Sequence, residues 1–519
     1  MTIDLTRFSP GPLTDAQLNA LVDALTAKFN GGITTSDVAA PLKLPGNLDM
    51  NSFEILNLYK LWSTRNLAER SSSTTVQNVF DEINTAGGGV VLLPADTTET
   101  LGTSGVSVGA NTLIVGEGES SVFATTGTIT NHMFRNKVNG DSGIQFINLK
   151  IDNSGASAGN FEGIGFTRTS RVKFTDVLFA VGRRRGVLLT TDSASNPCDR
   201  TNFTRCTFLL TGTATAGLHM TDVTRVSVTD CDFSQSVASS VGIQYAATGA
   251  TSKCDRISII DNEWVFATGA TQKGIEITAP ATNGLKKLQC DQNVAVSATA
   301  TVSPFIDIIG SGTNLMSNSS IDQNEYTSDG TTATAVIRIR SLRHFSISSN
   351  IISTDGTAVG ILIGASARSG TAAGCAGFVA DANVISTDTT GMAFCHPAGT
   401  DNFQLSVVSN NSVLNETEGS YEIWNLQADP TTFVMQITIT GNNAGGTSGV
   451  CWACYTGVGV TGGGRAGNAN NSFLILQGNV TVGTLVGNSV GDYFRETDVA
   501  TRKCLTDTND AGTATDNLR

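Results

Sequence analysis

The chain has 519 residues and a formal net charge of −13, with 15% charged residues, 6% aromatic residues and 55 glycines. A polyelectrolyte disordered protein would carry more charge, and a coiled-coil rod would be richer in Ala, Glu, Lys and Leu. The acidic balance disfavours binding to nucleic acid or to an anionic membrane surface, because both need cations to neutralise phosphates.

The N-terminal region predicts a helix but no export signal. Its first residues have no apolar core, and no run of about 18 apolar residues occurs in the chain, so we expect neither a secretory signal nor membrane insertion. Residues 14–30 predict an amphipathic helix that packs on copies of itself or on a partner, because apolar side chains follow Thr14 at steps of three and four: Leu18, Leu21, Leu25 and Phe29. Further along, the pattern predicts a short helix over 75–85, a Gly-rich turn and a strand over 87–94.

From about residue 143 the sequence repeats one design. Each unit has a short apolar strand, often opened by Gly, and a second strand that reads apolar-x-apolar-x-x-Asn. The last position of that second strand is occupied in turn by Cys206, Cys231, Asn262, Asn293, Asn324, Asn350, Asn383, Asn410, Asn442 and Asn479. The mean step is (479 − 206)/9, about 30 residues. Such units are too short for capped helical repeats and lack the leucine-rich and Trp-Asp patterns.

A unit of this length with period-2 strands predicts one coil of an all-β, right-handed parallel β-helix, with about 12 coils in all. Equivalent residues then stack about 4.8 Å apart. The recurrent Asn predicts a ladder of amides at a turn, with Cys as a small apolar substitute on the first two rungs. We expect four regions: an attachment and oligomerisation region (1–70), a capping helix with the first coils (71–142), the β-helix body (143–490) and a polar C-terminal extension (491–519).

The ten cysteines are scattered rather than closely spaced. We expect buried free thiols, which fit a protein made in a reducing cytoplasm, with a disulfide or a metal site as alternatives. Cys451 and Cys454 form a lone CxxC with no His nearby in the sequence. The sequence therefore predicts no metal and no cofactor.

Two motifs carry a family resemblance. Ile83-Asn-Thr-Ala-Gly-Gly-Gly-Val-Val-Leu-Leu-Pro94 resembles the opening signature of pectate-lyase-like β-helices. Leu44-Pro-Gly-Asn-Leu-Asp-Met-Asn-Ser-Phe-Glu-Ile-Leu-Asn-Leu58 resembles an element of the N-terminal regions of phage tail and head fibres, although Ser52 and Phe53 stand where that element has Gly and a polar residue. Together these resemblances indicate a bacteriophage tailspike.

The resemblance implies a homotrimer that is synthesised in the host cytoplasm and held on the virion through contacts between its N-terminal region and tail or head proteins. It also implies a β-helix that binds, and often cleaves, host surface polysaccharide such as O-antigen, capsule or exopolysaccharide. A non-catalytic receptor-binding or virion-decorating spike is the alternative from another class. A secreted polysaccharide lyase is a third interpretation, disfavoured by the missing signal.

One outward column of side chains predicts a catalytic site. Aligning the Gly-first strands brings into register Leu188, His219, Gln244, Glu276, Asp307, Arg338, Leu362 and Ala393. Glu276 and Asp307 on neighbouring rungs would lie about 5 Å apart, the separation in a retaining glycosidase, so we expect a general acid at Glu276 and a nucleophile at Asp307. Arg338, His219 and Gln244 would contact the substrate. The alternative is a solvated ladder or a contact between chains.

A second group of candidates flanks the Asn positions. Glu263 and Glu325 each follow a ladder Asn and precede an aromatic residue, Trp264 and Tyr326. Two rungs separate the carboxylates by about 10 Å, at the upper end of the range for an inverting pair, and we expect the aromatics to stack on sugar rings. Polar turn residues that only confer solubility are the alternative. The basic run at 183–185 is a further candidate contact for an anionic polysaccharide. For cleavage, a hydrolase is favoured over a lyase.

Overall fold

Contacts divide the chain into two units, residues 1–58 and residues 59–519. The structure, a computed structural model, describes side chains and backbone within the second unit only. The predicted helix over 14–30 and the element over 44–58 therefore lie outside the described residues. The described residues are 64–71, 75–125, 127–158, 161–191, 197–247, 253–267, 270–279, 285–297, 301–302, 304–310, 318–329, 335–340, 342–355, 359–364, 375, 377–388, 390–396, 406–415, 421–425, 436–446, 452–456, 473–477, 480–481 and 505–506.

A short helix begins the described fold. Helix α2 (Val76–Thr85) starts at Thr75, whose side-chain oxygen accepts a hydrogen bond from the Asn78 amide, and this confirms the helix predicted over 75–85. One face of α2 is fully buried, because its apolar residues recur at helical spacing: Val76, Val79, Phe80 and Ile83. Phe80 packs edge-on against Phe134, so α2 covers the apolar core at this end. A 3-10 helix (Leu67–Glu69) and strand β1 (Arg65–Asn66) precede it.

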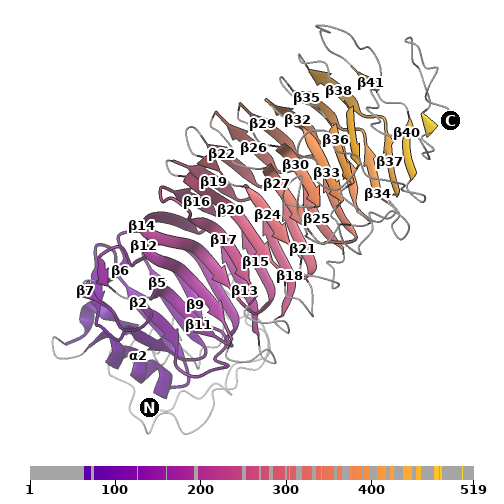
Figure 1. The fold of residues 1–519 in the computed structure, drawn as a ribbon. Coiled ribbons are helices and arrows are strands. Elements are labelled where there is room, and N and C mark those ends of the chain that lie inside the picture. Colours follow the sequence, from indigo (N-terminus) through magenta and orange to yellow (C-terminus); the bar gives the residue numbers. More distant parts are fainter. Residues whose placement is uncertain are drawn as a thin grey trace, which may run out of the picture. The chain divides into compact units, whose positions relative to one another are not determined.

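The body is a stack of parallel strands arranged in three ladders (Figure 1). Ladder 1 corresponds to the apolar-x-apolar-x-x-Asn strands, and β1 pairs with its first member. Ladder 1 consists of β2 (Gly89–Leu93), β5 (Thr112–Gly116), part of β9 (Gln145–Asp152), part of β12 (Ser170–Thr190), β13 (Cys198–Thr204), β15 (Val223–Thr229), β18 (Cys254–Ile260), β21 (Leu285–Asp291), β25 (Ser319–Asp322), β28 (Phe345–Ser348), β31 (Val379–Asp381), β34 (Ser406–Ser409), β37 (Gln436–Thr440), β40 (Phe473–Gln477) and β42 (Leu505–Thr506).

Ladder 2 follows the Asn turn and was not foreseen as a separate strand of each coil. It consists of β3 (Thr98–Leu101), β6 (Val122–Thr125), parts of β9 and β12, β14 (Thr207–Met220), β16 (Asp232–Gln235), β19 (Glu263–Phe266), β22 (Val294–Ser297), β26 (Glu325–Ser328), β29 (Ile351–Thr354), β32 (Val384–Thr387), β35 (Ser412–Asn415), β38 (Asn443–Gly446) and β41 (Val480–Thr481). Exposed and buried residues alternate along these short strands, as they do in a strand with one face on the lumen.

Ladder 3 corresponds to the Gly-first strands. It consists of β4 (Val106–Val108), β8 (Phe134–Asn136), β11 (Glu162–Thr167), parts of β12 and β14, β17 (Val241–Ala246), β20 (Ala270–Thr278), β24 (Ile306–Ile309), β27 (Ala335–Arg340), β30 (Val359–Gly364), β33 (Met392–His396), β36 (Tyr421–Asn425) and β39 (Trp452–Thr456). Two short pairs lie outside the ladders: β7 (Gly127–Thr128) with β10 (Ala156–Ala158), and β23 (Thr301–Val302) with β20.

These pairings make the second unit an all-β parallel solenoid. Along ladder 1, about ten turns separate β12 from β40. The polar extension predicted over 491–519 is described only at β42, which pairs with β40 in parallel and prolongs ladder 1 by one strand. The predicted parallel β-helix is confirmed in this coarser form.

Apolar side chains of all three ladders fill the lumen. A run of aromatic rings follows ladder 2, where Phe208, Phe233 and Trp264 stack with ring centroids 4.8 Å apart at each step. The next position in this column is the small Ala295, and Phe305 fills the space beside it, 5.3 Å from Trp264. Close packing of this kind requires matched side-chain volumes on successive rungs.

The Asn ladder is present at the turn between ladders 1 and 2. Each amide nitrogen donates to the amide oxygen one turn further on, from Asn262 to Asn293 at 2.9 Å and onward through Asn324, Asn350, Asn383, Asn411 and Asn442. Asn411 takes the position that was assigned to Asn410, so that expectation was wrong by one residue. Asn410 instead has the left-handed backbone (φ 54°) that recurs before the ladder, whereas the ladder residue itself turns inward. Asn479 lies outside the described residues.

The first two rungs of this ladder are cysteines, as expected. The Cys206 amide donates to Cys231 Sγ at 3.3 Å, and the Cys231 amide donates to Asn262 Oδ1 at 3.0 Å. The cysteines whose state the structure describes are free and buried: Cys198, Cys206, Cys231, Cys254, Cys290 and Cys375. At these six positions the predicted free thiols are confirmed.

The Gly that opens many ladder 3 strands has a steric cause. A Cβ on Gly186 or Gly217 would lie 2.8 Å from the carbonyl oxygen of the equivalent Gly one turn further on. Only Gly allows this close approach between backbones. Gly therefore recurs at the start of these strands because successive turns pack closely there.

Candidate functional site

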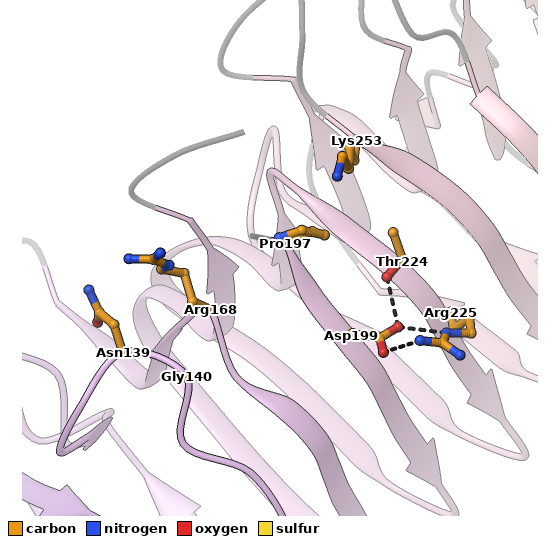
Figure 2. Close-up of a pocket in the computed structure, with 8 residues that line it drawn as sticks. All are labelled: Asn139, Gly140, Arg168, Pro197, Asp199, Thr224, Arg225 and Lys253. Atoms are coloured by element: carbon orange, nitrogen blue, oxygen red, sulfur yellow. Dashed lines mark hydrogen bonds and ion pairs between the residues drawn. The ribbon is translucent and has the colours of Figure 1, made fainter. Parts of the chain in front are cut away.

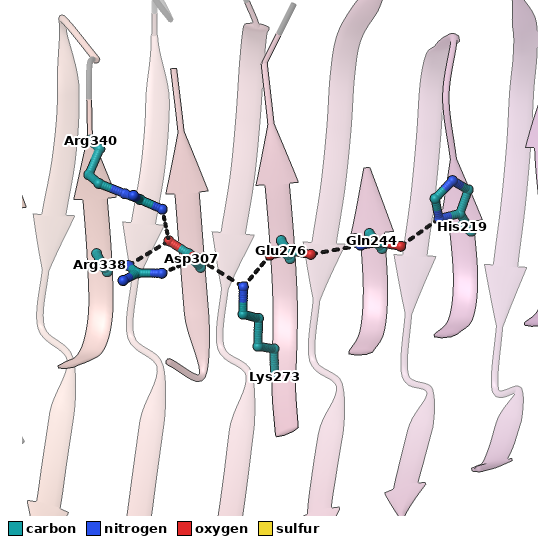
Figure 3. A network of polar contacts seen from close by, with 7 residues as sticks. All are labelled: His219, Gln244, Lys273, Glu276, Asp307, Arg338 and Arg340. Atoms are coloured by element: carbon teal, nitrogen blue, oxygen red, sulfur yellow. Dashed lines mark hydrogen bonds and ion pairs between the residues drawn. The ribbon is translucent and has the colours of Figure 1, made fainter. Parts of the chain in front are cut away.

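The predicted outward column exists on ladder 3. Backbone pairing places Leu188 opposite His219, His219 opposite Gln244, and Gln244 opposite Glu276. The same register continues through Asp307 and Arg338 to Leu362 and Ala393. Figure 3 shows the polar part of the column, where side chains from successive strands meet in one continuous line. The register predicted from the sequence is confirmed.

Asp307 is the centre of this line. Its side chain has 0% exposure, although it points away from the lumen, because three long cationic side chains converge on it. Arg338 donates from Nε to Oδ1 at 2.9 Å and from Nη2 to Oδ2 at 2.6 Å. Arg340 Nη2 lies 3.3 Å from Oδ1, and Lys273 Nζ lies 3.2 Å from Oδ2. Both carboxylate oxygens are therefore engaged by cations.

These contacts set the ionisation of Asp307. Burial raises the pKa of the carboxyl group, but the hydrogen bonds and charges of Arg338, Arg340 and Lys273 lower it by more. The net effect is a pKa below the ordinary value, so Asp307 is an anion at neutral pH. A buried carboxylate with three cations holds a local excess of positive charge close to the surface.

Glu276 lies one rung before Asp307 and shares a cation with it. Lys273 forms ion pairs with both carboxylates, to Glu276 Oε1 and Asp307 Oδ2. Gln244 Nε2 donates to Glu276 Oε2 at 2.7 Å. Unlike Asp307, the side chain of Glu276 remains 17% exposed. It is the carboxylate of the pair that an external ligand reaches first.

His219 ends the line on the other side. Its Nδ1 lies 2.6 Å from Gln244 Oε1. Burial is the largest cause that lowers its pKa, with a further contribution from Arg185, and the pKa falls to about 4. The imidazole is therefore neutral at pH 7. A neutral ring that donates from Nδ1 to the amide oxygen keeps Nε2 as a hydrogen-bond acceptor.

The column thus combines several chemical functions within a few rungs. It offers a hydrogen-bond acceptor at His219, a partly exposed carboxylate at Glu276 and guanidinium groups around Asp307. Hydroxyl and carboxylate groups of a sugar polymer match such a set of donors and acceptors. For Asp307 to attack a sugar directly, at least one of its cations has to move away, because both oxygens are occupied.

The second predicted group is only partly brought together. Glu263 and Glu325 are exposed on ladder 2 and lie two rungs apart with Val294 between them, as the spacing predicts. Trp264 and Tyr326 do not face a sugar: both are buried in the lumen, at 0% and 1% exposure. The expected stacking role was wrong because these residues belong to strands, where the neighbour of an outward Glu must point inward.

The sequence analysis does not predict three residues of the site. Lys273 lies three residues before Glu276, Arg340 lies two residues after Arg338 on the same outward face, and Glu162 opens β11. Because outward side chains recur at every second residue of a strand, the outward position of Arg338 predicts that Arg340 also points outward. Glu162 has 0% side-chain exposure and lies 2.5 Å from His132 Nδ1 and 3.2 Å from Arg185.

The basic run at 183–185 is used within the chain. Arg183 donates to the Ala156 carbonyl at 2.8 Å, and both Arg184 and Arg185 lie within ion-pair distance of Glu162. In the described part of the chain no group of three or more His, Cys, Asp or Glu side chains is arranged to hold a metal ion. No helix among the described residues is long and apolar enough to cross a membrane.

Comparisons with known proteins find similarity at the level of the fold. No protein-family model matches the chain, and no curated protein matches its sequence. Among solved structures, a double mutant of the tailspike protein of E. coli bacteriophage HK620 aligns with 13% identity and a TM-score of 0.45 over 79% of this chain and 75% of that one. A mutant of the same tailspike in complex with a pentasaccharide aligns with a TM-score of 0.43 and 13% identity, over the same shares. The pre-mature gene product 12 of bacteriophage phi29 aligns with a TM-score of 0.49 and 12% identity over 80% of this chain and 55% of that one.

Proposed function

We propose that the protein is a virion spike that binds host surface polysaccharide along the outer face of ladder 3. The observation that carries this proposal is the unbroken polar line from His219 to Arg338, which runs along the solenoid rather than around a single pocket. Its rungs recur about every 4.8 Å. A repeating surface of this kind suits a repeating polymer, and solenoids present such extended binding surfaces.

We also propose self-association into a homotrimer of right-handed coils. Exposed apolar side chains gather on the outer face of ladder 2: Val265, Val294, Val296, Ile351, Val384 and Leu414. Contiguous exposed apolar patches mark interaction sites on soluble proteins. Three copies that pack through ladder 2 would bury this face and leave ladder 3 open to the polysaccharide. The implied attachment to tail or head proteins through residues 1–70 belongs to the same proposal.

Cleavage of the bound polysaccharide is a second candidate, favoured by one observation. Glu276 and Asp307 are carboxylates on adjacent rungs, one partly exposed and one held as an anion by cations. Two carboxylates in unlike environments are the arrangement that separates a proton donor from a nucleophile. In this candidate Glu276 is the general acid and Asp307 the nucleophile, and Arg338 moves aside to bind an acidic or hydroxyl group of the sugar.

The test is binding and cleavage of purified O-antigen, capsule and exopolysaccharide from candidate hosts. Gln244→Ala, which breaks the line at its middle, should weaken binding about tenfold, whereas the ladder 2 control Glu325→Gln should not. If the wild type releases reducing ends and Glu276→Gln does not, the result supports hydrolysis at this site. Products with unsaturated ends would indicate a lyase, and binding without new chain ends an adsorption spike. If no polysaccharide binds, the proposed function is wrong.

A further inference from the structure

A column of cations runs along the edge of ladder 1, away from the ladder 3 site. Strand pairing places Arg171, Arg200, Arg225, Arg256 and Lys287 on five successive rungs. Four of these residues are exposed, and Arg225 is half-buried. Four steps of about 4.8 Å give the column a length of roughly 19 Å. We call this set the basic column.

The backbone at these positions makes the choice of residues unusual. All five residues have left-handed backbone, with φ between 54° and 57°. Gly and Asn adopt this conformation at lower cost than long side chains do. The same structural position is occupied by Asn111 and Gly143 on the two preceding rungs, and by Asn318 on the rung that follows. Five consecutive rungs therefore carry a cation where a residue better suited to the turn is available.

The basic column reverses the charge of the chain locally. The neighbouring column on the same rungs contains Lys286 and the carboxylates of Asp199 and Asp255. The two columns together carry six cations against two carboxylates, an excess of four positive charges on a chain with a net charge of −13. Such a stripe attracts anionic ligands.

An open pocket lies beside the column, at the turn that leads into ladder 1 (Figure 2). Its volume is about 550 Å³, and its lining includes Arg168, Pro197, Asp199, Thr224, Arg225 and Lys253. Three of these side chains are cations and one is a carboxylate. In the described part of the chain no carboxylate lies within ion-pair distance of the Lys253 ammonium group, which is therefore available to an anionic ligand.

One arginine of the column is held in place. Thr224 Oγ1 donates to Asp199 Oδ1 at 2.7 Å, and Arg225 pairs with the same carboxylate through Nε and Nη2. Burial raises the pKa of Asp199, but these hydrogen bonds lower it by more, so the carboxylate stays ionised. The pair fixes Arg225 at the wall of the pocket, between Arg200 and Arg256.

From these observations we infer that the basic column and the adjacent pocket bind an acidic polysaccharide, one that carries uronate or other carboxylate groups, with the polymer lying along the solenoid. This inference rests on the proposed function and specifies the class of sugar polymer. Nucleic acid is the other polyanion of suitable length. Proteins that bind single strands combine cations with exposed aromatic rings, and none of the exposed large hydrophobic side chains in the described residues is aromatic.

The test compares polygalacturonate, neutral dextran and an oligodeoxythymidylate in affinity measurements at several salt concentrations. The variant carries four changes, Arg171→Asn, Arg200→Asn, Arg256→Asn and Lys287→Asn, since Asn is the residue that the same column already uses at Asn111 and Asn318. We expect wild type to bind polygalacturonate but not dextran. The variant should bind at least about tenfold more weakly, with a smaller salt dependence.

A matched pair of single changes separates the column from charge in general. Arg256→Asn should weaken binding to polygalacturonate. Arg205→Asn should not, because Arg205, although also exposed and left-handed, directly follows β13 and lies outside the basic column. Unchanged binding by the fourfold variant, or tighter binding of the oligodeoxythymidylate than of polygalacturonate, would overturn the inference. Binding to polygalacturonate through the column, with no binding to any host polysaccharide, would instead refute the proposed function alone.

Discussion

The outer faces of ladders 2 and 3 share one backbone pattern and carry opposite chemistry. On ladder 2 the outward positions between β19 and β35 are exposed and often apolar, with Val384 at 51% and Leu414 at 54% exposure. On ladder 3 the outward positions between β14 and β27 are polar or charged, yet largely buried under one another. Inward positions must fill the lumen on both ladders, so only the outward columns are free to take on separate roles. We propose that the ladder 2 face serves self-association and the ladder 3 face serves ligand binding.

The largest effect should come from the centre of the ladder 3 face. Asp307→Ala leaves Arg338, Arg340 and Lys273 close together without their shared anion. Breaking a buried ion-pair group in this way costs about 3–5 kcal/mol. We expect a clear fall in the unfolding midpoint in urea and in heat. Glu325→Gln on the exposed ladder 2 face is the control and should change the midpoint little; equal effects would contradict the contrast between the faces.

The second effect is a pH dependence at the end of the same line. The pKa of His219 is about 4 in the folded protein and about 6.5 in an unfolded chain, so the unfolded state binds a proton first as pH falls. The free energy of unfolding should therefore fall by up to about 3 kcal/mol as the pH is lowered from 6.5 to 4. His219→Gln should remove this part of the pH dependence, and His344→Asn should not. A His219 ring signal that titrates near pH 6.5 in NMR spectra would refute the assignment.

A smaller loss of stability is expected at the Asn ladder, which borders the ladder 2 face at its turn from ladder 1. Asn324→Ala removes the acceptor for both the backbone and side-chain amides of Asn293 and the donor to Asn350. Buried groups left without partners cost about 1–3 kcal/mol each, so we expect about 2–3 kcal/mol in total after local adjustment. Gln323→Asn, one residue earlier and exposed, is the matched control. A loss below that of the control would show that the ladder does not stabilise the stack.

The smallest effect on stability should come from the ladder 2 face. Val384→Ser combined with Leu414→Ser should change stability by less than about 0.5 kcal/mol but shift the solution mass from a trimer toward a monomer. Light scattering behind size exclusion measures the mass directly. Val138→Ser, at an equally exposed position outside ladder 2, should leave the trimer intact. If the wild-type protein is a monomer in solution, the proposal that this face mediates self-association is wrong.

The sequence contains the fold because each structural constraint repeats. Gly recurs at positions such as 186 and 217, where the backbones of successive turns approach closely. Asn recurs at positions such as 324, where a side-chain amide must bond to the turns on both sides. The register of Glu276 and Asp307 followed from these repeats. The error between Asn410 and Asn411 arose because two adjacent Asn satisfy the same pattern, and only backbone conformation separates them.

The site was harder to predict than the fold. The strand register predicts which side chains are neighbours. It does not predict the conformations of long Lys and Arg side chains, so the sequence does not predict that Lys273 and Arg340 bury Asp307. The inward direction of Trp264 was predictable once the third strand of the coil was recognised. The sequence signal for this direction is weak, because ladder 2 strands such as β19 and β22 are only four residues long.

The most direct test of the central claim is a crystal structure of the full chain with an oligosaccharide cut from a surface polysaccharide that the protein binds. We expect sugar density along ladder 3, within hydrogen-bond distance of His219, Glu276 or Arg338. The basic column would hold a second segment if the polymer is acidic. Density confined to the exposed face of ladder 2, or to the basic column alone, would contradict the claim that ladder 3 is the binding face.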